Sequence, residues 1–301
     1  MAVGQLSAGS SAITDRVRRT VALLRRRGYA LSPSRLAEMC IGGAVSEAEV
    51  RWAAVATHDL VITEGLVVDS EVAPAARAIR ARAAAHGTES GPYLGEALGF
   101  VHRLVAVAPF IRSVSIAGSL ASGGFRQSDD VDLNLIVDDG HRHIAYVVVN
   151  VLGLLHALRH RRKPVDDLTR RPLAPRLMTA NLILERSQCR PLVRQDEDMA
   201  FELLVAEPVF GQAEIREILE ANRNLVEHFP QLAERPSPLL IEAPRRLPRA
   251  LYPTFLDRPA RLLGEAAWHY MQWTRRGRPA ALARVAYVRS TMRPYTLFDS
   301  P

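Results

Sequence analysis

The residues of this chain best suited to chemistry are two aspartates, Asp130 and Asp132, which open a predicted strand. Side chains alternate between the faces of a strand, so Asp130, Asp132 and Asn134 share one face while Val131 and Leu133 share the other. Carboxylates held this close repel each other, and a hard divalent cation is the usual partner that relieves the repulsion. The pair therefore predicts a site for Mg²⁺, or for Mn²⁺ in its place.

A Gly-Ser turn precedes these aspartates and supplies groups that a metal site alone lacks. A predicted strand from Arg112 to Ala117 leads into Gly118 and Ser119. Glycine lets the backbone approach a ligand closely, and exposed amides beside a serine hydroxyl can hold phosphate oxygens. A strand, a phosphate-holding turn and a strand with paired aspartates, in that order, are typical of proteins that handle nucleotides.

Three successive stretches of this chain are Ala117-Gly118-Ser119, a spacer from Leu120 to Asp129, and Asp130-Val131-Asp132-Leu133. Together they resemble the signature of the nucleotidyltransferases of the DNA polymerase beta superfamily. The resemblance implies that a nucleoside triphosphate, with ATP the expected one, donates its monophosphate to an acceptor and releases pyrophosphate. It also implies that Asp130 and Asp132 hold two Mg²⁺ ions, while Gly118 and Ser119 fix the terminal phosphates. The acceptor is left open among a small molecule, a protein and an RNA end.

Three basic or hydroxyl side chains are further candidates for binding phosphate. Arg126 and Ser128 lie in the spacer, and Lys163 ends a basic run that begins at Arg159. If that run folds over the site it can bind triphosphate, and otherwise it is a solvated helix end favoured by the helix dipole.

The third acid that the superfamily usually carries, on a strand beside the aspartate pair, has no clear counterpart here. On the strand predicted from Arg176 to Glu185, alternation places Thr179, Asn181, Ile183 and Glu185 on one face. Asn181 can coordinate a metal through its carbonyl oxygen but cannot take a proton. Glu185 can act as the base if the strand is shifted, and otherwise it is an ordinary strand-end acid.

The predicted fold class is α+β: a small mixed nucleotidyltransferase sheet with flanking helices, preceded by a winged-helix module and followed by a helical C-terminal region. The corresponding domains are residues 1–88, 89–198 and 199–301. The first boundary is inferred from a linker-like stretch between His86 and Pro92. Three segments, Asn181 to Leu184, Ala200 to Gly211 and Leu219 to Asn222, resemble a little-characterised group of bacterial and archaeal nucleotidyltransferases, and the resemblance implies this order of modules.

The N-terminal module is predicted from three helices and a hairpin. The helices run from Thr14 to Arg27, from Ser32 or Ser34, and from Ser46 to about His58, and the hairpin turns at Glu64-Gly65. Winged-helix modules often read DNA with the helix before the hairpin. Here that helix opens with Glu47 and Glu49, which repel phosphate, so specific DNA binding is disfavoured and a packing or protein-contact role is favoured.

The composition narrows the class of protein further. The chain has 301 residues, a net charge of +7 and only two cysteines, which excludes a disulfide framework and a cysteine-based zinc site. Its longest apolar run, Ile144 to Leu158, is shorter than the ~20 residues that cross a bilayer. With no secretion signal recognisable, the expected compartment is the cytoplasm, without a membrane partner.

Two other functions remain open from the sequence. One is that the chain is a regulatory pseudoenzyme that binds nucleotide without turnover, and Asn181 motivates this hypothesis. The other is that the chain is a winged-helix DNA-binding regulator in which Asp130 and Asp132 are incidental.

Overall fold

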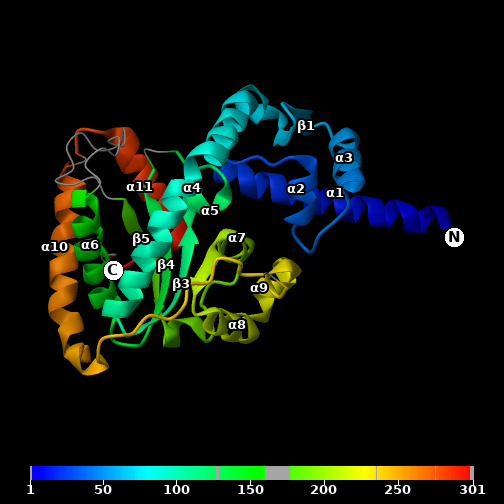
Figure 1. Cartoon of the computed structure of the whole chain (residues 1–301). Coiled ribbons are helices and arrows are strands. Elements are labelled where there is room, and N and C mark those ends of the chain that lie inside the picture. Colours follow the sequence, from blue (N-terminus) through cyan, green and yellow to red (C-terminus); the bar gives the residue numbers. More distant parts are fainter. Residues whose placement is uncertain (1, 127–128, 160–176, 235, 275, 299–301) are drawn as a thin grey trace. The chain divides into compact units, whose positions relative to one another are not determined.

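The computed structural model describes residues 2–126, 129–159, 177–234, 236–274 and 276–298 (Figure 1). The fold is mixed α+β, with a two-stranded and a four-stranded sheet. Among the described helices, none is both long enough and apolar enough to span a membrane.

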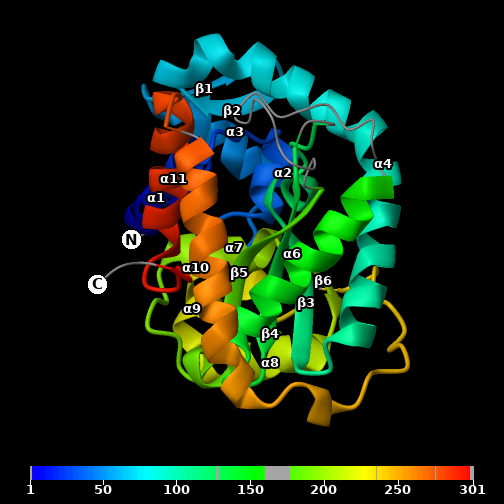
Figure 2. The same cartoon turned by 90° about the vertical axis from the view of Figure 1, so that its left-hand side faces the viewer.

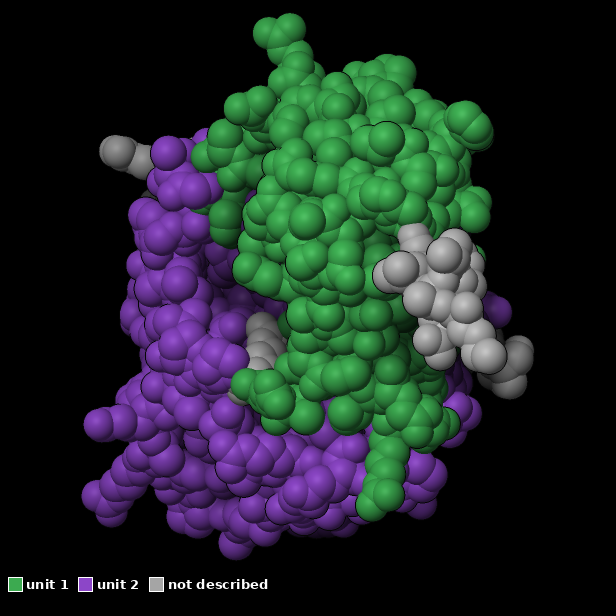
Figure 3. All heavy atoms as spheres, turned by 90° about the vertical axis from the view of Figure 1, so that its right-hand side faces the viewer, with its two compact units in different colours: residues 1–86, 195–204, 223–235 green, residues 87–194, 205–222, 236–301 purple. Residues whose placement is uncertain are grey.

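The chain forms two compact units, which Figure 3 colours separately. The first contains residues 1–86, 195–204 and 223–235, and the second contains residues 87–194, 205–222 and 236–301. This division differs from the three domains expected from the sequence, because two segments that lie beyond residue 194 belong with the N-terminal elements. Contacts between segments far apart in the chain, which composition does not reveal, decide the division.

The first unit begins with the elements that the sequence predicts, in the predicted order. They are α1 (Ala2–Arg26), α2 (Pro33–Glu38), α3 (Glu47–Ala56), β1 (Leu60–Thr63) and β2 (Leu66–Asp69). The Ser46 capping box is confirmed, since the Ser46 hydroxyl accepts from the Glu49 amide and the Glu49 carboxylate accepts from the Ser46 amide. The hairpin turn is confirmed as well, with positive φ angles of 51° at Glu64 and 74° at Gly65.

The later segment 223–235 joins this unit through hydrogen bonds to its backbone. The segment 223–235 contains α9 (Arg223–His228), whose last residue accepts a 2.7 Å hydrogen bond from the Gly42 amide. The Gln231 side chain then donates to the carbonyl oxygens of Glu38 and Cys40. These contacts supply partners to the backbone of the turn after α2, which otherwise has none in a helix or sheet.

The four-stranded sheet of the second unit has the strand order β5-β4-β3-β6. Its strands are β3 (Ile111–Ala117), β4 (Val131–Val137), β5 (Met178–Glu185) and β6 (Glu207–Phe210). Strand β3 runs antiparallel to β4 and β6, whereas β4 and β5 are parallel. The strands predicted around the Gly-Ser turn and at Glu185 are thereby confirmed.

Strand β6 lies within residues 199–301, which were expected to form a helical C-terminal region. Its Val209 is fully buried, and Pro208 occupies an edge strand, where a missing amide is tolerated. The strand is difficult to predict from the sequence, because it is short and lies between two helices, α7 (Glu197–Val205) and α8 (Gln212–Ala221). The region expected to form a separate helical domain therefore contributes a strand to the core sheet.

One face of the sheet is covered by helices α4 (Ala76–Val107) and α6 (Arg142–Arg159) (Figure 2). The apolar residues of β3 and β4 alternate toward this face and pack against the helices. The fully buried side chains include Phe100, Leu104, Val114, Leu133 and Val149. Since Asp132 of β4 alternates with these core residues, burial of the apolar set directs its carboxylate to the opposite face.

The predicted linker between His86 and Pro92 is wrong, because these residues lie within α4. Helix α4 runs continuously through Gly87, Gly91 and Pro92, and the division between the two units falls inside it. Glycine costs a helix only about 1 kcal/mol and proline about 3 kcal/mol, so the packing of the remaining turns can outweigh both.

Helices α8 and α9 are separated by Asn222. This side chain is fully buried, accepts from the Leu192 amide and donates to the carbonyl oxygen atoms of Cys189 and Ile218. An asparagine that satisfies backbone groups from its own side chain competes with the regular helix, which ends there.

Helix α10 (Asp257–Thr274) is joined to α6 by its first residue. The Asp257 carboxylate accepts hydrogen bonds of 2.8 and 2.9 Å from the amides of His143 and Ile144, in the first turn of α6, and lies 2.7 Å from His143 Nδ1. Burial would raise the pKa of Asp257, but the hydrogen bonds from His143 and the two amides outweigh it and lower the pKa. One carboxylate thus starts α10 and caps α6.

We expect Asp257→Ala to reduce the free energy of unfolding by about 2 kcal/mol at pH 7, because three hydrogen bonds to an ionised group are lost. The lowered pKa means that this stabilisation is present above the ordinary pKa of about 3.9 and is lost as the pH falls through the folded-state value. Denaturant unfolding at several pH values measures it. The control Glu265→Ala removes the exposed ion pair with Arg261 and should reduce the free energy of unfolding by less than about 0.5 kcal/mol. Equal reductions in the two variants would contradict the capping role of Asp257.

Candidate functional site

The candidate site is built where β3 ends and β4 begins. Ala117 of β3 pairs with Asp132 of β4, so the turn that leaves β3 starts beside the Asp132 carboxylate. Gly118 has a φ of +63°, and a Cβ atom placed on it would lie 2.1 Å from Asp132 Oδ2. Both the backbone conformation and the space require glycine at this position.

The turn continues as the short helix α5 (Gly118–Ser122). The Ser119 carbonyl accepts from the Gly124 amide at 3.0 Å, and Gly123 ends the helix with a φ of +84°. The structure thus places Gly118 against Asp132, and Ser119 is the second residue of α5.

Asp132 lies on β4, on the face opposite to Val131 and Leu133, as expected from alternation, and Asp130 directly precedes the strand. Both are half-buried, whereas Val131 and Leu133 are completely buried on the other face. Two carboxylates beside a turn of backbone amides are a donor set that fits a divalent cation carrying phosphate groups. Within the described part of the chain, no three His, Cys, Asp or Glu side chains gather into a metal-binding group.

Strand β5 places two uncharged side chains against this face of β4. The Thr179 hydroxyl donates to Asp132 Oδ1 at 2.9 Å, from the residue directly opposite in the parallel pair. Asn181 Nδ2 donates to Asn134 Oδ1 at 3.1 Å. The contact of Thr179 with Asp132 is not predictable from the sequence, because a cross-strand contact requires the register to be known.

The expectation that Thr179, Asn181, Ile183 and Glu185 share one face is wrong. The pairing of β4 with β5 shifts by one residue between Leu133 and Asn134, which leaves Asn181 as the extra residue of a bulge. After the bulge the faces exchange, so Ile183 is buried in the core among the helices. Simple alternation cannot anticipate such an insertion.

Glu185 is not brought to the site, which corrects its assignment as a candidate catalytic base. It pairs with Val137, five residues along β4 from Asp132, a separation of about 16 Å. Val137 belongs to the apolar face, and the Glu185 carboxylate accepts a 2.8 Å hydrogen bond from the Gly140 amide. The role of Glu185 is to hold the turn after β4.

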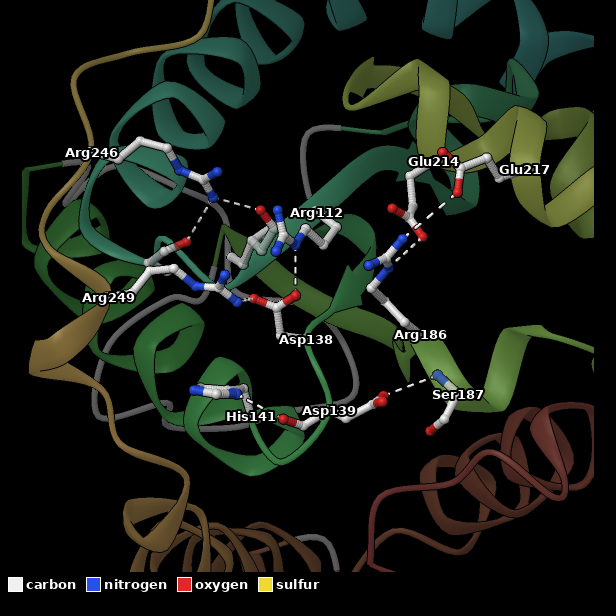
Figure 4. A network of polar contacts seen from close by, with 12 residues as sticks. Arg112, Asp138, Asp139, His141, Arg186, Ser187, Glu214, Glu217, Arg246 and Arg249 are labelled. Carbon is white, nitrogen blue, oxygen red and sulfur yellow. Dashed lines mark hydrogen bonds and ion pairs between the residues drawn. The ribbon is translucent and has the colours of Figure 1, made fainter.

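That turn is the centre of a network of polar contacts (Figure 4). Asp138 accepts from Arg112 at 2.6 Å and from Arg249, and Asp139 accepts from the Ser187 amide at 2.9 Å. The ring nitrogen atoms of His141 lie 3.0 and 2.8 Å from the carbonyl oxygen atoms of Asp139 and Tyr252. In the same network, the Arg246 guanidinium donates to the Ile111 carbonyl oxygen at 2.5 Å. Burial of this guanidinium, and secondly the charge of Arg112, lower the pKa of Arg246. Partners from distant segments tie this end of β4 to the fold.

The remaining phosphate candidates are less closely connected to Asp132. Arg126 is exposed, and its backbone exchanges hydrogen bonds of 3.1 and 2.9 Å with Asp129 in the spacer. Ser128 and Lys163 lie outside the described residues.

Comparisons with known proteins find no relative. The chain matches no protein-family model, no curated protein and no solved structure.

We expect Gly118→Ala to destabilise the protein by about 3 kcal/mol, because it adds a clash with Asp132 to the strain of a positive φ. Gly123→Ala is the matched control: its φ is also positive, but nothing lies within 4 Å of an added Cβ. The free energy of unfolding of this control should fall by about 1 kcal/mol. Denaturant unfolding of both variants measures the difference, and equal losses would show that Gly118 and Asp132 are not packed together.

Proposed function

We propose that this protein is a metal-dependent nucleotidyltransferase. The observation that carries the proposal is the packing of the Gly118 turn directly against Asp132, which joins a phosphate-binding backbone to a metal-binding carboxylate. The resemblance of the same residues to the DNA polymerase beta superfamily supports this interpretation. The reaction transfers the monophosphate of a nucleoside triphosphate, with ATP the expected donor, to an acceptor.

In the proposed reaction an acceptor hydroxyl loses its proton to solvent water, its oxygen forms a bond to the α-phosphorus, and the bond from that phosphorus to the leaving pyrophosphate breaks. Asp130 and Asp132 are the residues that would hold Mg²⁺ or Mn²⁺. Once bound, the cation would neutralise phosphate charge and lower the pKa of the acceptor. The amides that follow Gly118 and the Ser119 hydroxyl bind the terminal phosphates.

Thr179 acts through Asp132 in this proposal. Its hydroxyl donates to Asp132 Oδ1, which fixes the orientation of the carboxylate and leaves Oδ2 on the side of the Gly118 turn. Partners of this kind hold metal ligands in a productive orientation.

A second candidate function is a regulatory module that binds nucleotide without turnover. The observation that favours it is the position of Glu185, which lies about 16 Å along the strand from Asp132, together with Thr179 and Asn181 on the neighbouring strand. None of these residues can accept a proton from an acceptor held at Asp132. This function predicts metal-dependent nucleotide binding with no release of pyrophosphate.

The proposal does not extend to specific DNA binding. Arginines of α1 pair with acids of the same unit, as Arg18 does with Asp59 and Arg25 with Asp69 and Glu71. On α3, Arg51 pairs with Glu47. Charges used in this way contribute less to phosphate contacts, which supply most of the affinity for DNA.

We expect Asp132→Asn to reduce pyrophosphate release from nucleoside triphosphates on the order of 100-fold or more, because the substitution removes the charge that holds the cation. The measurement uses each of the four ribonucleoside triphosphates with Mg²⁺ or Mn²⁺, in the presence of candidate acceptors. Glu185→Gln is the control: it keeps an oxygen for the Gly140 amide and should retain turnover within about twofold. Unchanged turnover in Asp132→Asn would refute the proposal, and binding without turnover in the unsubstituted protein would favour the regulatory module.

A further inference from the structure

Residues 245–256, which we call the strap, precede α10 and run past the start of β3 and the end of β4 (Figure 2). The Leu247 amide donates to the carbonyl oxygen of Ala106, in the last turn of α4, at 2.8 Å. Further along, the Tyr252 carbonyl oxygen lies 2.8 Å from His141 Nε2. These contacts fix the strap against one end of the sheet of the second unit.

The inner face of the strap packs on this unit. The Arg246 guanidinium donates to the carbonyl oxygen of Ile111, the first residue of β3. The Tyr252 ring meets Phe110 edge-on, with the ring centroids 5.1 Å apart, and Leu256 packs against the hydrophobic core. Because these side chains are turned inward, the other side chains of the strap form a separate outer face.

Three large apolar side chains lie on the outer face at intervals of four residues, Leu247, Leu251 and Phe255. All three are exposed, Leu251 to 57% and Phe255 to 69%. A cavity of about 170 Å³ at this end of the unit has His141 and Tyr252 in its wall, but none of these three residues. Apolar side chains grouped on an exposed surface usually mark a place of interaction.

The charged side chains of the strap are all arginines, since residues 243–256 contain no acid. Arg249 pairs with Asp138. Arg245, and Arg258 in the first turn of α10, are both exposed, and in the part of the chain that the structure describes neither has an ion-pair partner. The outer face therefore combines apolar side chains with uncompensated positive charge.

We infer that the outer face of the strap binds the surface of a membrane that contains anionic lipids, because it presents a row of apolar side chains beside unpaired arginines. The arginines contact the lipid phosphates, and the apolar side chains enter the boundary between headgroups and acyl chains. The inference does not depend on the proposed function. It differs from the expectation, drawn from the sequence, that the protein has no membrane partner.

The same observations disfavour other partners. A second copy of this chain would bring the arginines of two straps together. A nucleic acid supplies phosphates but has no apolar layer to receive Leu251 and Phe255. A protein partner needs pockets that match projecting side chains, whereas a lipid surface adapts to them.

The test is sedimentation of the intact chain with vesicles of phosphatidylcholine, either pure or with roughly one-third phosphatidylserine. We expect binding to the anionic vesicles that is about 10-fold tighter than binding to the neutral ones. Raising the salt concentration from about 0.1 M to about 0.5 M should weaken it, because salt screens the arginines.

The apolar contribution is tested by the double variant Leu251→Ser and Phe255→Ser. We expect it to bind anionic vesicles on the order of 100-fold more weakly, because each lost side chain accounts for about 10-fold. The control Val55→Ser removes an 85% exposed side chain from α3 and should bind as the unsubstituted protein does. Thermal unfolding verifies that each variant is folded.

The charge is tested by Arg258→Glu, which we expect to weaken binding by about 10-fold. Arg77→Glu is the matched control, because Arg77 is also exposed and is also the second residue of a helix, α4. An acid in the first turn is favoured by the helix dipole, so both variants should fold. The control should bind anionic vesicles within about twofold of the unsubstituted protein.

Several results would overturn the inference. One is failure of the unsubstituted protein to bind anionic vesicles, and another is equal binding to both kinds of vesicle. Binding that persists in the Leu251 and Phe255 variant would show attraction of charge alone. A dimer that this variant loses would assign the face to a second copy, and binding of duplex DNA that depends on Arg258 but not on Phe255 would assign it to nucleic acid.

Discussion

The antiparallel pairing of β3 with β4 is the constraint on which the candidate site depends. Backbone hydrogen bonds place Ala117 opposite Asp132, so the turn after β3 must begin beside the carboxylate that opens β4. The approach is possible because residue 118 has no Cβ and adopts a positive φ. A slip of one residue in this register would turn Asp132 toward the core and Leu133 toward the turn. Burial of the apolar face by α4 and α6 therefore protects the geometry of the site, although these helices contribute none of its proposed ligands.

Strand β5 satisfies two different environments along its length. At its start Thr179 meets the Asp132 carboxylate, and near its end Ile183 is buried beneath the helices. In a regular strand, residues separated by an even number of positions share one face, but Thr179 and Ile183 must point to opposite faces. The bulge at Asn181 resolves the conflict by inserting one residue and exchanging the faces. The same bulge brings Asn181 to Asn134, so a device that serves the core also sets the polarity of the site.

Much of this arrangement can be predicted from local patterns. The Ser46 capping box, the Glu64-Gly65 turn and the alternation around Asp132 each depend on neighbouring residues, and each is confirmed. The expectations that fail depend on distant contacts: β6 exists because β3 offers it an edge, and Glu185 is held by the turn after β4. The linker expected between His86 and Pro92 fails for a different reason, since composition measures only the intrinsic cost of a helix and not the packing that outweighs it. Residues outside the described part of the chain, Ser128 and Lys163, stay as predictions.

Two acidic pairs flank β4, and the sequence alone does not distinguish them. At the end of the strand, Asp138 is neutralised by Arg112 and Arg249, and Asp139 accepts from a backbone amide. At its start, Asp132 receives a neutral hydroxyl from Thr179 and lies against a glycine. An aspartate that already has two arginine partners gains little from a cation, so Asp138 is a poor candidate for a metal ligand. The arginine partners of Asp138 are therefore the reason to leave the end of β4 out of the proposed metal site.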